Sequence, residues 1–82
     1  MYSFLFNPFA EKQFKKLNKE LQRRILEVLG RIKIRPHHFV KRLVGSSYYR
    51  LRVGDYRIVL DIQNDKLIIV IIELGHRKNI YK

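Results

Sequence analysis

Cysteine is absent from this chain, and long apolar runs are absent as well. Without cysteine there is no disulfide bond, no thiolate zinc site and no cysteine nucleophile. The apolar run LIIVIIEL, residues 67–74, is far shorter than the roughly 20 residues that a membrane-spanning helix requires. The N-terminal MYSFLFNPFA lacks a basic leader and a small-residue cleavage pattern, which predicts no signal peptide. We therefore expect a cytoplasmic protein without a membrane contact.

Glycine and proline are scarce, with four and two residues, and they stand where they would separate elements. No repeat or low-complexity tract is visible. A chain of 82 residues has too little apolar interior for two domains. We therefore expect one domain over residues 1–82.

Acidic residues are also few, because 7 aspartates and glutamates face 18 lysines and arginines. The resulting net charge of +11 attracts polyanions. Nucleic acid or an acidic protein is the expected partner, and a charge that serves solubility alone is the alternative.

The first half of the chain predicts a strand followed by two helices. YSFLF, residues 2–6, is typical of a short strand, and Asn7 followed by Pro8 is typical of a helix start. Asn18 can cap a second helix, which Pro36 prevents from continuing. Apolar residues suited to a core recur through the two helices, at Phe9, Phe14 and Leu17 and then at Leu21, Ile25, Val28, Leu29 and Ile32.

The second half predicts a three-stranded antiparallel meander. Residues 37–47 lack periodicity and are expected to form a loop. The strand candidates YYRLRV, YRIVLDI and KLIIVIIEL follow, joined by turn-forming residues at 54–55 and 64–65. LIIVIIEL is apolar on both faces, so we place it centrally, beside the N-terminal strand. The predicted fold is α+β, in the order β-α-α-β-β-β, with a helical hairpin on one face of a four-stranded sheet.

Arginines gather on one face of the first hairpin of this meander. With a two-residue turn at residues 54–55, Arg52 lies opposite Arg57, and alternation puts Tyr48 and Arg50 on the same face. Like charges that face each other across strands are destabilising. We interpret the cluster as an anion site, since guanidinium groups bind phosphate bidentately. An ordinary cationic sheet face is the alternative.

The end of the last strand carries a histidine and an arginine whose directions are harder to predict. A two-residue turn at residues 64–65 would put His76 on the arginine face and Arg77 on the other. Gly75 can bend or bulge the strand at this point and redirect Arg77. Strand alternation therefore leaves the direction of Arg77 open.

The order of elements and the motifs YRLRVGDYRIV and LGHRKNIY resemble the RelE/ParE superfamily of toxins from toxin–antitoxin operons. The resemblance covers nearly the whole chain and is closer to the RelE branch. It implies a toxin that cleaves messenger RNA in the A site of a 70S-type ribosome. The implied chemistry is attack of a 2′-hydroxyl on the adjacent phosphate, without a metal or other cofactor. The implied partner is a cognate antitoxin, which can assemble with the toxin into a heterotetramer.

The resemblance also implies site residues. In the RelE branch the site contains two basic residues on the second strand, an arginine on the third, an arginine just past the fourth, and a C-terminal tyrosine. Here those positions hold Arg50, Arg52, Arg57, Arg77 and Tyr81. The best-known member has lysines where this chain has arginines on the second strand. We expect Arg52 and Arg57 to hold the phosphate, Arg77 to act on the leaving oxygen, and Tyr81 to stack on a base.

The base that removes the 2′-hydroxyl proton is not obvious, because arginine keeps its proton in proteins. His76 is our hypothesis for this base, since histidine changes its charge nearest to neutral pH. A surface histidine near a strand end is the alternative reading of His76. The His37-His38 pair lacks a convergent carboxylate or cysteine, so we expect loop surface there and no metal site.

Three further basic residues of the loop region are expected to contact RNA electrostatically, and Tyr48 is expected to bind RNA beside the arginines. The basic residues are Arg35, Lys41 and Arg42. Two other functions stay open at this point. One is a ParE-like toxin that inhibits DNA gyrase without nuclease activity, and the other is an inactive relative that only binds nucleic acid.

Overall fold

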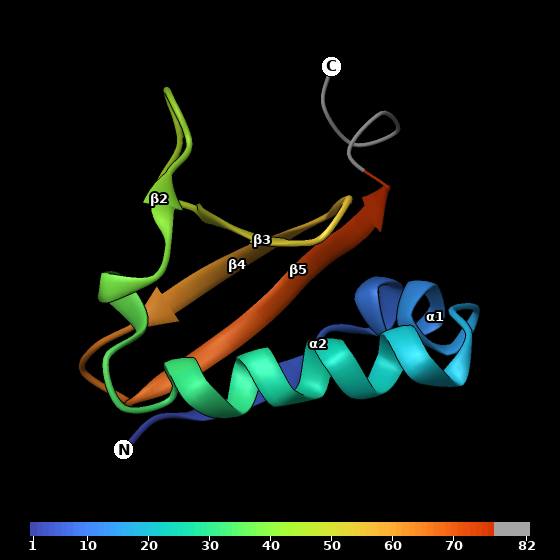
Figure 1. Ribbon diagram of the computed structural model, residues 1–82. Helices are drawn as coiled ribbons and strands as arrows, with labels where there is room; N and C mark the ends of the chain where they lie inside the picture. The colour runs from blue at the N-terminus through green and yellow to red at the C-terminus, as the bar shows by residue number, and fades with distance from the viewer. Residues whose placement is uncertain (77–82) are drawn as a thin grey trace.

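The computed structural model describes residues 1–76, in which two helices cover one face of a five-stranded sheet (Figure 1). The elements in chain order are β1 (Ser3–Phe6), α1 (Pro8–Lys15), α2 (Lys19–Ile32), the 3-10 turn η1 (Pro36–His38), β2 (Lys41–Arg42), β3 (Tyr49–Val53), β4 (Tyr56–Gln63) and β5 (Ile68–His76). The strand order across the sheet is β1-β5-β4-β3-β2. The expected α+β fold and its meander are confirmed.

Both helices begin where the sequence predicts. The Asn7 side chain accepts a hydrogen bond from the Ala10 N–H at 2.7 Å, and the Asn18 side chain accepts one from the Leu21 N–H at 2.8 Å. Each bond satisfies one of the N–H groups that have no partner inside a helix. Gln22 then joins the two helices, because its amide donates to the Phe14 carbonyl oxygen at 3.2 Å. In the described residues no helix is long and apolar enough to cross a membrane.

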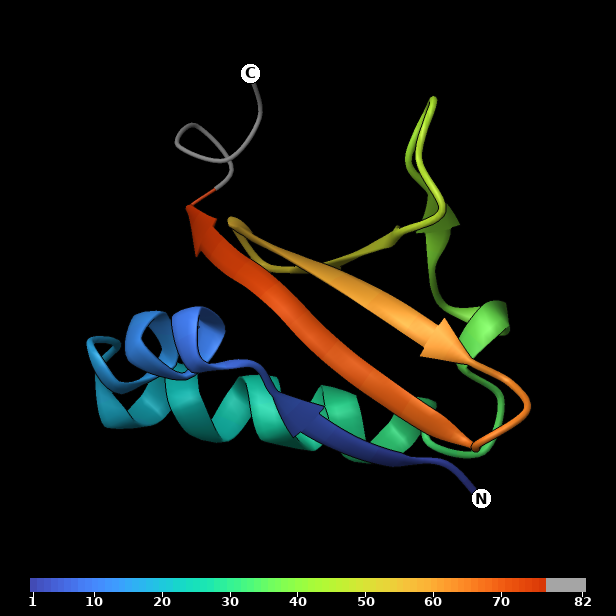
Figure 2. The same ribbon diagram turned by 180° about the vertical axis from the view of Figure 1, so that it is seen from behind.

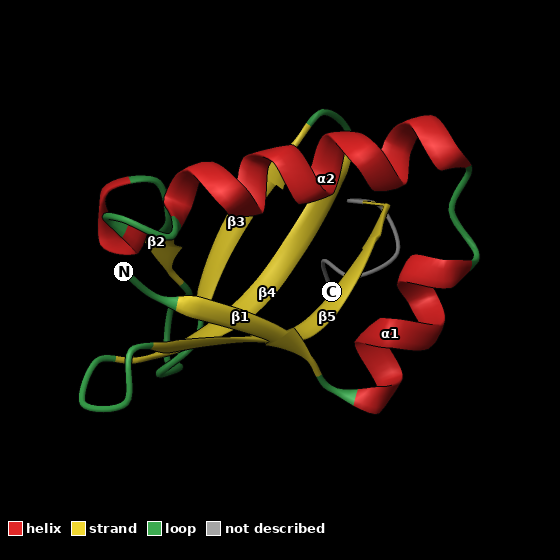
Figure 3. Ribbon diagram, turned by 90° about the horizontal axis from the view of Figure 1, so that it is seen from below, coloured by secondary structure: helices red, strands yellow, loops and turns green. Residues whose placement is uncertain are grey.

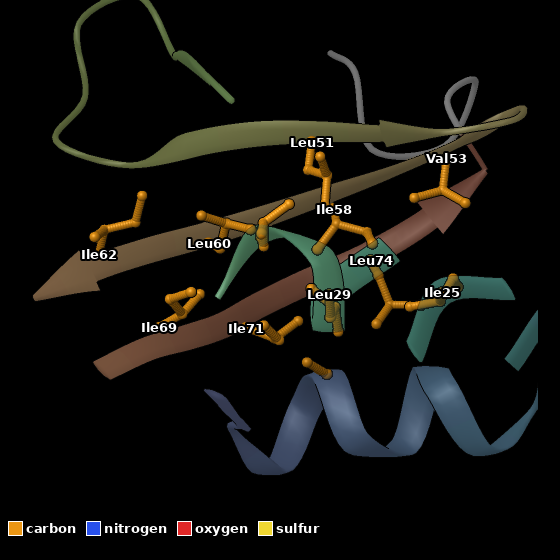
Figure 4. Packing of buried hydrophobic residues seen from close by; sticks show 12 residues of the cluster. Ile25, Leu29, Leu51, Val53, Ile58, Leu60, Ile62, Ile69, Ile71 and Leu74 are labelled. Atoms are coloured by element: carbon orange, nitrogen blue, oxygen red, sulfur yellow. The ribbon is translucent and has the colours of Figure 1, made fainter. Parts of the chain in front are cut away.

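The core lies between the helices and the sheet (Figure 4). From below, α2 runs across the sheet and α1 lies near β5 (Figure 3). Phe9 does not join this core as expected, since it is 56% exposed and α1 buries Ala10 instead. Ala10, Phe14 and Leu17 recur at spacings of four and three, which turns Phe9 away from the buried stripe. The buried apolar residues of the larger elements are Ile25, Leu29 and Ile32 of α2 and Leu51, Val53, Ile58, Leu60, Ile62, Ile69, Ile71 and Leu74 of the sheet.

β5 is central, as predicted, because β1 pairs with it in parallel and β4 pairs with it antiparallel (Figure 2). The sheet has one more strand than expected. Lys41 and Arg42 form the short edge strand β2 in the segment that the sequence predicts as a loop. Two residues are too few to produce a period of two that a sequence pattern could reveal.

A β-bulge interrupts the pairing of β4 with β5. Leu60 pairs with Ile71, but Val59 pairs with Glu73, so Ile72 is an extra residue in β5. A bulge of this kind exchanges the two faces for every residue beyond it. The loop from β4 to β5 spans residues 64–67 and is two residues longer than expected. Two added residues leave the alternation unchanged, so the bulge alone reverses the predicted directions at the end of β5.

Candidate functional site

The β3–β4 hairpin has the register that the sequence predicts. Arg52 pairs with Arg57 across a turn at residues 54–55. Gly54 has φ of +59°, a left-handed conformation that glycine adopts without steric cost. Leu51, Val53 and Ile58 of this hairpin are buried toward the helices. Because side chains alternate along a strand, the arginines of the hairpin share the face that the helices leave open.

On this open face a pocket of about 260 Å³ is lined by Phe39, Lys41, Arg50, Arg52 and Arg57. Lys41 comes from β2, where it pairs with Arg50 of β3. The segment between β2 and β3 rises from the sheet on the side away from the helices (Figure 1). As far as the described part of the chain forms it, the lining combines four cationic side chains with one aromatic ring and no acidic residue. Such a surface suits an anion, and phosphate fits guanidinium groups in particular.

The cations of the pocket differ in depth. Arg57 is only 4% exposed, on a strand with neighbours on both sides, whereas Arg52 faces solvent. Arg57 therefore forms the floor of the pocket and Arg52 its rim. Charge interactions are stronger where water is excluded, so the floor attracts an anion more strongly per charge than the rim does.

Arg42, Arg35 and Tyr48 are not among the residues that line this pocket. Arg42 pairs with Tyr49, next to the Lys41–Arg50 pair. Because successive side chains of a strand point to opposite faces, Arg42 lies on the helix side of the sheet. Its guanidinium carbon is 5.4 Å from the Tyr49 ring centroid, and its Nη2 donates to the Tyr49 hydroxyl at 3.4 Å. The expected RNA contact at Arg42 is thus not part of the arginine cluster.

The predicted position of His76 on the arginine face is wrong. His76 pairs with Tyr56, and their rings meet edge to face with centroids 5.7 Å apart. Arg57 instead has Gly75 as its partner on β5. The extra residue Ile72 is the physical reason, since it exchanges the faces of the strand end. The other two C-terminal candidates, Arg77 and Tyr81, lie outside the described residues.

His37 has a structural role, because its side chain contacts residues from other parts of the chain. Its Nε2 lies 2.9 Å from Oδ1 of Asn64, which also accepts a hydrogen bond from the Tyr2 hydroxyl at 2.7 Å. Its ring packs edge to face against Tyr49, with centroids 5.2 Å apart. Over residues 1–76, no three histidine, cysteine or acidic side chains are placed to hold a metal ion together. His37 and Asn64 join the η1 turn to the β4–β5 loop.

The family model of the ParE toxin of the type II toxin–antitoxin system parDE matches residues 4–81 of this chain. The chain belongs to this toxin family. No curated protein matches the sequence.

Solved structures match the toxin over nearly its whole length. A chain of the toxin–antitoxin complex RelBE2 from Mycobacterium tuberculosis covers 93% of the toxin and 98% of its own length, with a TM-score of 0.82 and 24% identity. A chain of the intact E. coli RelBE complex covers 93% and 96%, with a TM-score of 0.80 and 21% identity. A chain of the archaeal RelE–RelB complex from Pyrococcus horikoshii covers 95% and 97%, with a TM-score of 0.79 and 28% identity. The toxin therefore has the fold of the RelE branch of the superfamily.

Sequence reasoning missed one residue of the pocket of the toxin, Phe39. Phe39 directly follows η1 with a helical backbone conformation (φ −111°, ψ −4°), and β2 begins only at Lys41. Strand alternation therefore does not extend to Phe39, and nothing in the sequence assigns it to the arginine face.

Proposed function

We propose that the toxin inhibits translation by cleaving messenger RNA in the ribosomal A site, without a metal ion. The 2′-oxygen attacks the adjacent phosphorus, and the bond from phosphorus to the 5′-oxygen breaks. The single observation that carries the proposal is the pocket in which Lys41, Arg50 and Arg52 converge around the buried Arg57. The fold of the RelE branch supports the choice of reaction.

The reaction needs removal of the 2′-hydroxyl proton, stabilisation of the negative charge on the phosphorane, and stabilisation of the leaving 5′-oxygen. The pocket meets the second of these needs directly. Negative charge grows on the phosphorane oxygens, and preorganised donors in a partly dry site stabilise it. In our proposal Arg57 and Arg52 hold the phosphate, and Arg50 and Lys41 add positive charge around it. We assign stabilisation of the negative charge on the leaving 5′-oxygen to Arg77, as a hydrogen-bond donor that keeps its own proton.

Removal of the 2′-hydroxyl proton has no assigned residue in the proposal. Arginine does not lose its proton in proteins, so the three arginines of the pocket do not serve. His76 packs against Tyr56 on the other face of the sheet, and we do not assign it this role. In the proposed site Tyr81 stacks on a base of the message, as its match to the RelE pattern implies.

We also propose that a cognate antitoxin silences the toxin in the cytoplasm. The solved relatives from M. tuberculosis, E. coli and P. horikoshii are toxin–antitoxin complexes. With a net charge of +11, the toxin attracts an acidic segment, and a segment laid over the arginine pocket would exclude RNA. Pairs of toxin and antitoxin can then assemble further into a heterotetramer.

A second candidate is ParE-like inhibition of DNA gyrase without nuclease activity. The observation that favours it is the match of residues 4–81 to the ParE toxin family. The arginine pocket supports the first candidate over the second, because clustered guanidinium groups suit the phosphate of an RNA substrate.

Purified translation of a defined message, followed by mapping of its 5′ ends, tests the proposal. We expect cuts that require the ribosome with the wild-type toxin and none with Arg52→Ala. Arg23→Ala is the matched control, since it removes one exposed arginine from α2 and leaves the pocket intact. An intact message, together with inhibition of DNA supercoiling by gyrase in a separate assay, would favour the gyrase candidate instead.

A further inference from the structure

Phe39 stands out among the residues that line the cationic pocket. Among the lining residues within 1–76 it is the one aromatic side chain, and half of its surface (50%) is exposed. A pocket that bound phosphate alone would have no use for an exposed aromatic wall. Proteins that bind single-stranded nucleic acid, in contrast, combine cationic grooves with aromatic side chains on which bases stack.

The backbone around Phe39 is held in place on both sides. Before it, Pro36 is fully buried, and the Phe39 N–H donates to the Pro36 carbonyl oxygen at 3.2 Å. After it, Val40 packs against the core and Lys41 is paired with Arg50 in the sheet. A backbone held in this way loses little conformational freedom when a ligand stacks on the ring that it carries.

The surroundings of the Phe39 ring leave room for such a ligand. Within residues 1–76 its one ring contact is with His38, edge to face, with centroids 5.4 Å apart. The Phe39 ring and the three arginines line the same pocket of about 260 Å³. A nucleotide carries its phosphate and its base on different sides of the ribose, so one nucleotide can engage both kinds of wall.

We propose that Phe39 is a stacking platform for one unpaired base of the RNA, beside the phosphate held by the arginines. This role rests on the proposed function, because it takes RNA as the ligand of the pocket. It differs from the role assigned to Tyr81, since Phe39 belongs to the segment between η1 and β2. The pocket then recognises a single-stranded nucleotide by its phosphate and its base together.

Binding of a short single-stranded oligonucleotide with 2′-deoxy sugars tests this proposal without cleavage. One probe carries all bases, and a series of probes lacks one base each. For the wild type we expect loss of one base to weaken binding roughly 5- to 150-fold, the range for stacking on an aromatic side chain. Loss of the other bases should weaken binding less.

Two variants of Phe39 and one control complete the experiment. Phe39→Leu keeps an apolar side chain but removes the ring, so the sensitivity to that base should disappear. Phe39→Tyr keeps the ring and should retain it. Phe9→Leu is the matched control, since Phe9 is a similarly exposed phenylalanine of α1, outside the pocket, and should behave as wild type.

The proposal is overturned if Phe39→Leu retains the wild-type sensitivity to loss of that base. Phe39 would then contact a protein partner or be ordinary surface. The test is separate from that of the proposed function, because the deoxy probes cannot be cleaved. A message that stays intact on the ribosome would refute mRNA cleavage and leave the stacking result standing.

Discussion

Arg52 and Arg57 lie directly opposite each other on neighbouring strands, with Arg57 buried and Arg52 exposed. Like charges in directly opposed cross-strand positions destabilise a sheet by about 0.2–1 kcal/mol. A bound phosphate would reverse this interaction, since both guanidinium groups would then face an anion. The hairpin thus gives up some stability of the free protein in return for anion affinity.

Arg52→Gln is expected to separate stability from function. Removing the exposed member of the pair relieves the repulsion, so the free energy of unfolding should rise by about 0.2–1 kcal/mol in chemical denaturation. The rate of ribosome-dependent cleavage should fall by roughly 10²–10³-fold, the cost of losing one donor to a transition-state oxyanion. Arg23→Gln on α2 is the control and should change neither quantity beyond its charge effect. A less stable Arg52→Gln protein would contradict the repulsion.

The salt dependence of oligonucleotide binding should report the arginines of the pocket individually. For single strands, the logarithm of the binding constant falls with the logarithm of the salt concentration, with a slope of about −0.7 for each phosphate contact. We therefore expect Arg50→Gln to make this slope less steep by about 0.7, and Arg31→Gln on the outer side of α2 to leave it unchanged. Equal slopes for wild type and Arg50→Gln would mean that Arg50 does not contact phosphate.

His76→Gln is expected to leave the cleavage rate within about threefold of wild type, because His76 packs against Tyr56 on the helix side of the sheet. A general base normally contributes about 10²–10⁴-fold to a rate. Cleavage assays between pH 5.5 and 8 on wild type and variant provide the measurement. A loss of two orders of magnitude in a folded variant would return His76 to the role that the sequence suggests.

Deleting Ile72 should leave the fold intact. Ile72 is the extra residue of the bulge, so its removal preserves the pairs Leu60–Ile71 and Val59–Glu73 and makes the ladder regular. We expect a loss of about 1–2 kcal/mol in the free energy of unfolding, for the apolar surface of a partly buried isoleucine.

Deletion of Val59 from β4 is the contrasting variant. It would exchange the faces of one part of β4 and move buried side chains such as Ile58 out of the core. We expect this variant not to unfold cooperatively. Similar stabilities for the two deletions, measured by thermal unfolding, would contradict the assignment of the bulge.

The directions of side chains were predictable only in strands where apolar and charged residues alternate. The arginine face was predictable because a two-residue turn sets the register of β3 and β4, and apolar and charged residues alternate clearly there. The direction of His76 was not predictable, because LIIVIIEL is apolar on both faces and no residue in it is marked as extra. Phe39 was not predictable either, because it lies between η1 and β2, where no periodic pattern indicates the direction of a side chain. The roles of Arg77 and Tyr81 remain predictions.

The bulge in β5 also bears on how toxins of this fold can diverge. The extra residue Ile72 can be lost while the core contacts of Ile69, Ile71 and Leu74 are kept. A deletion at this position leaves the fold intact, whereas a deletion in β4 would move buried side chains out of the core. Evolution can therefore alter how β5 ends, beside the arginine pocket, without rebuilding the hydrophobic interior.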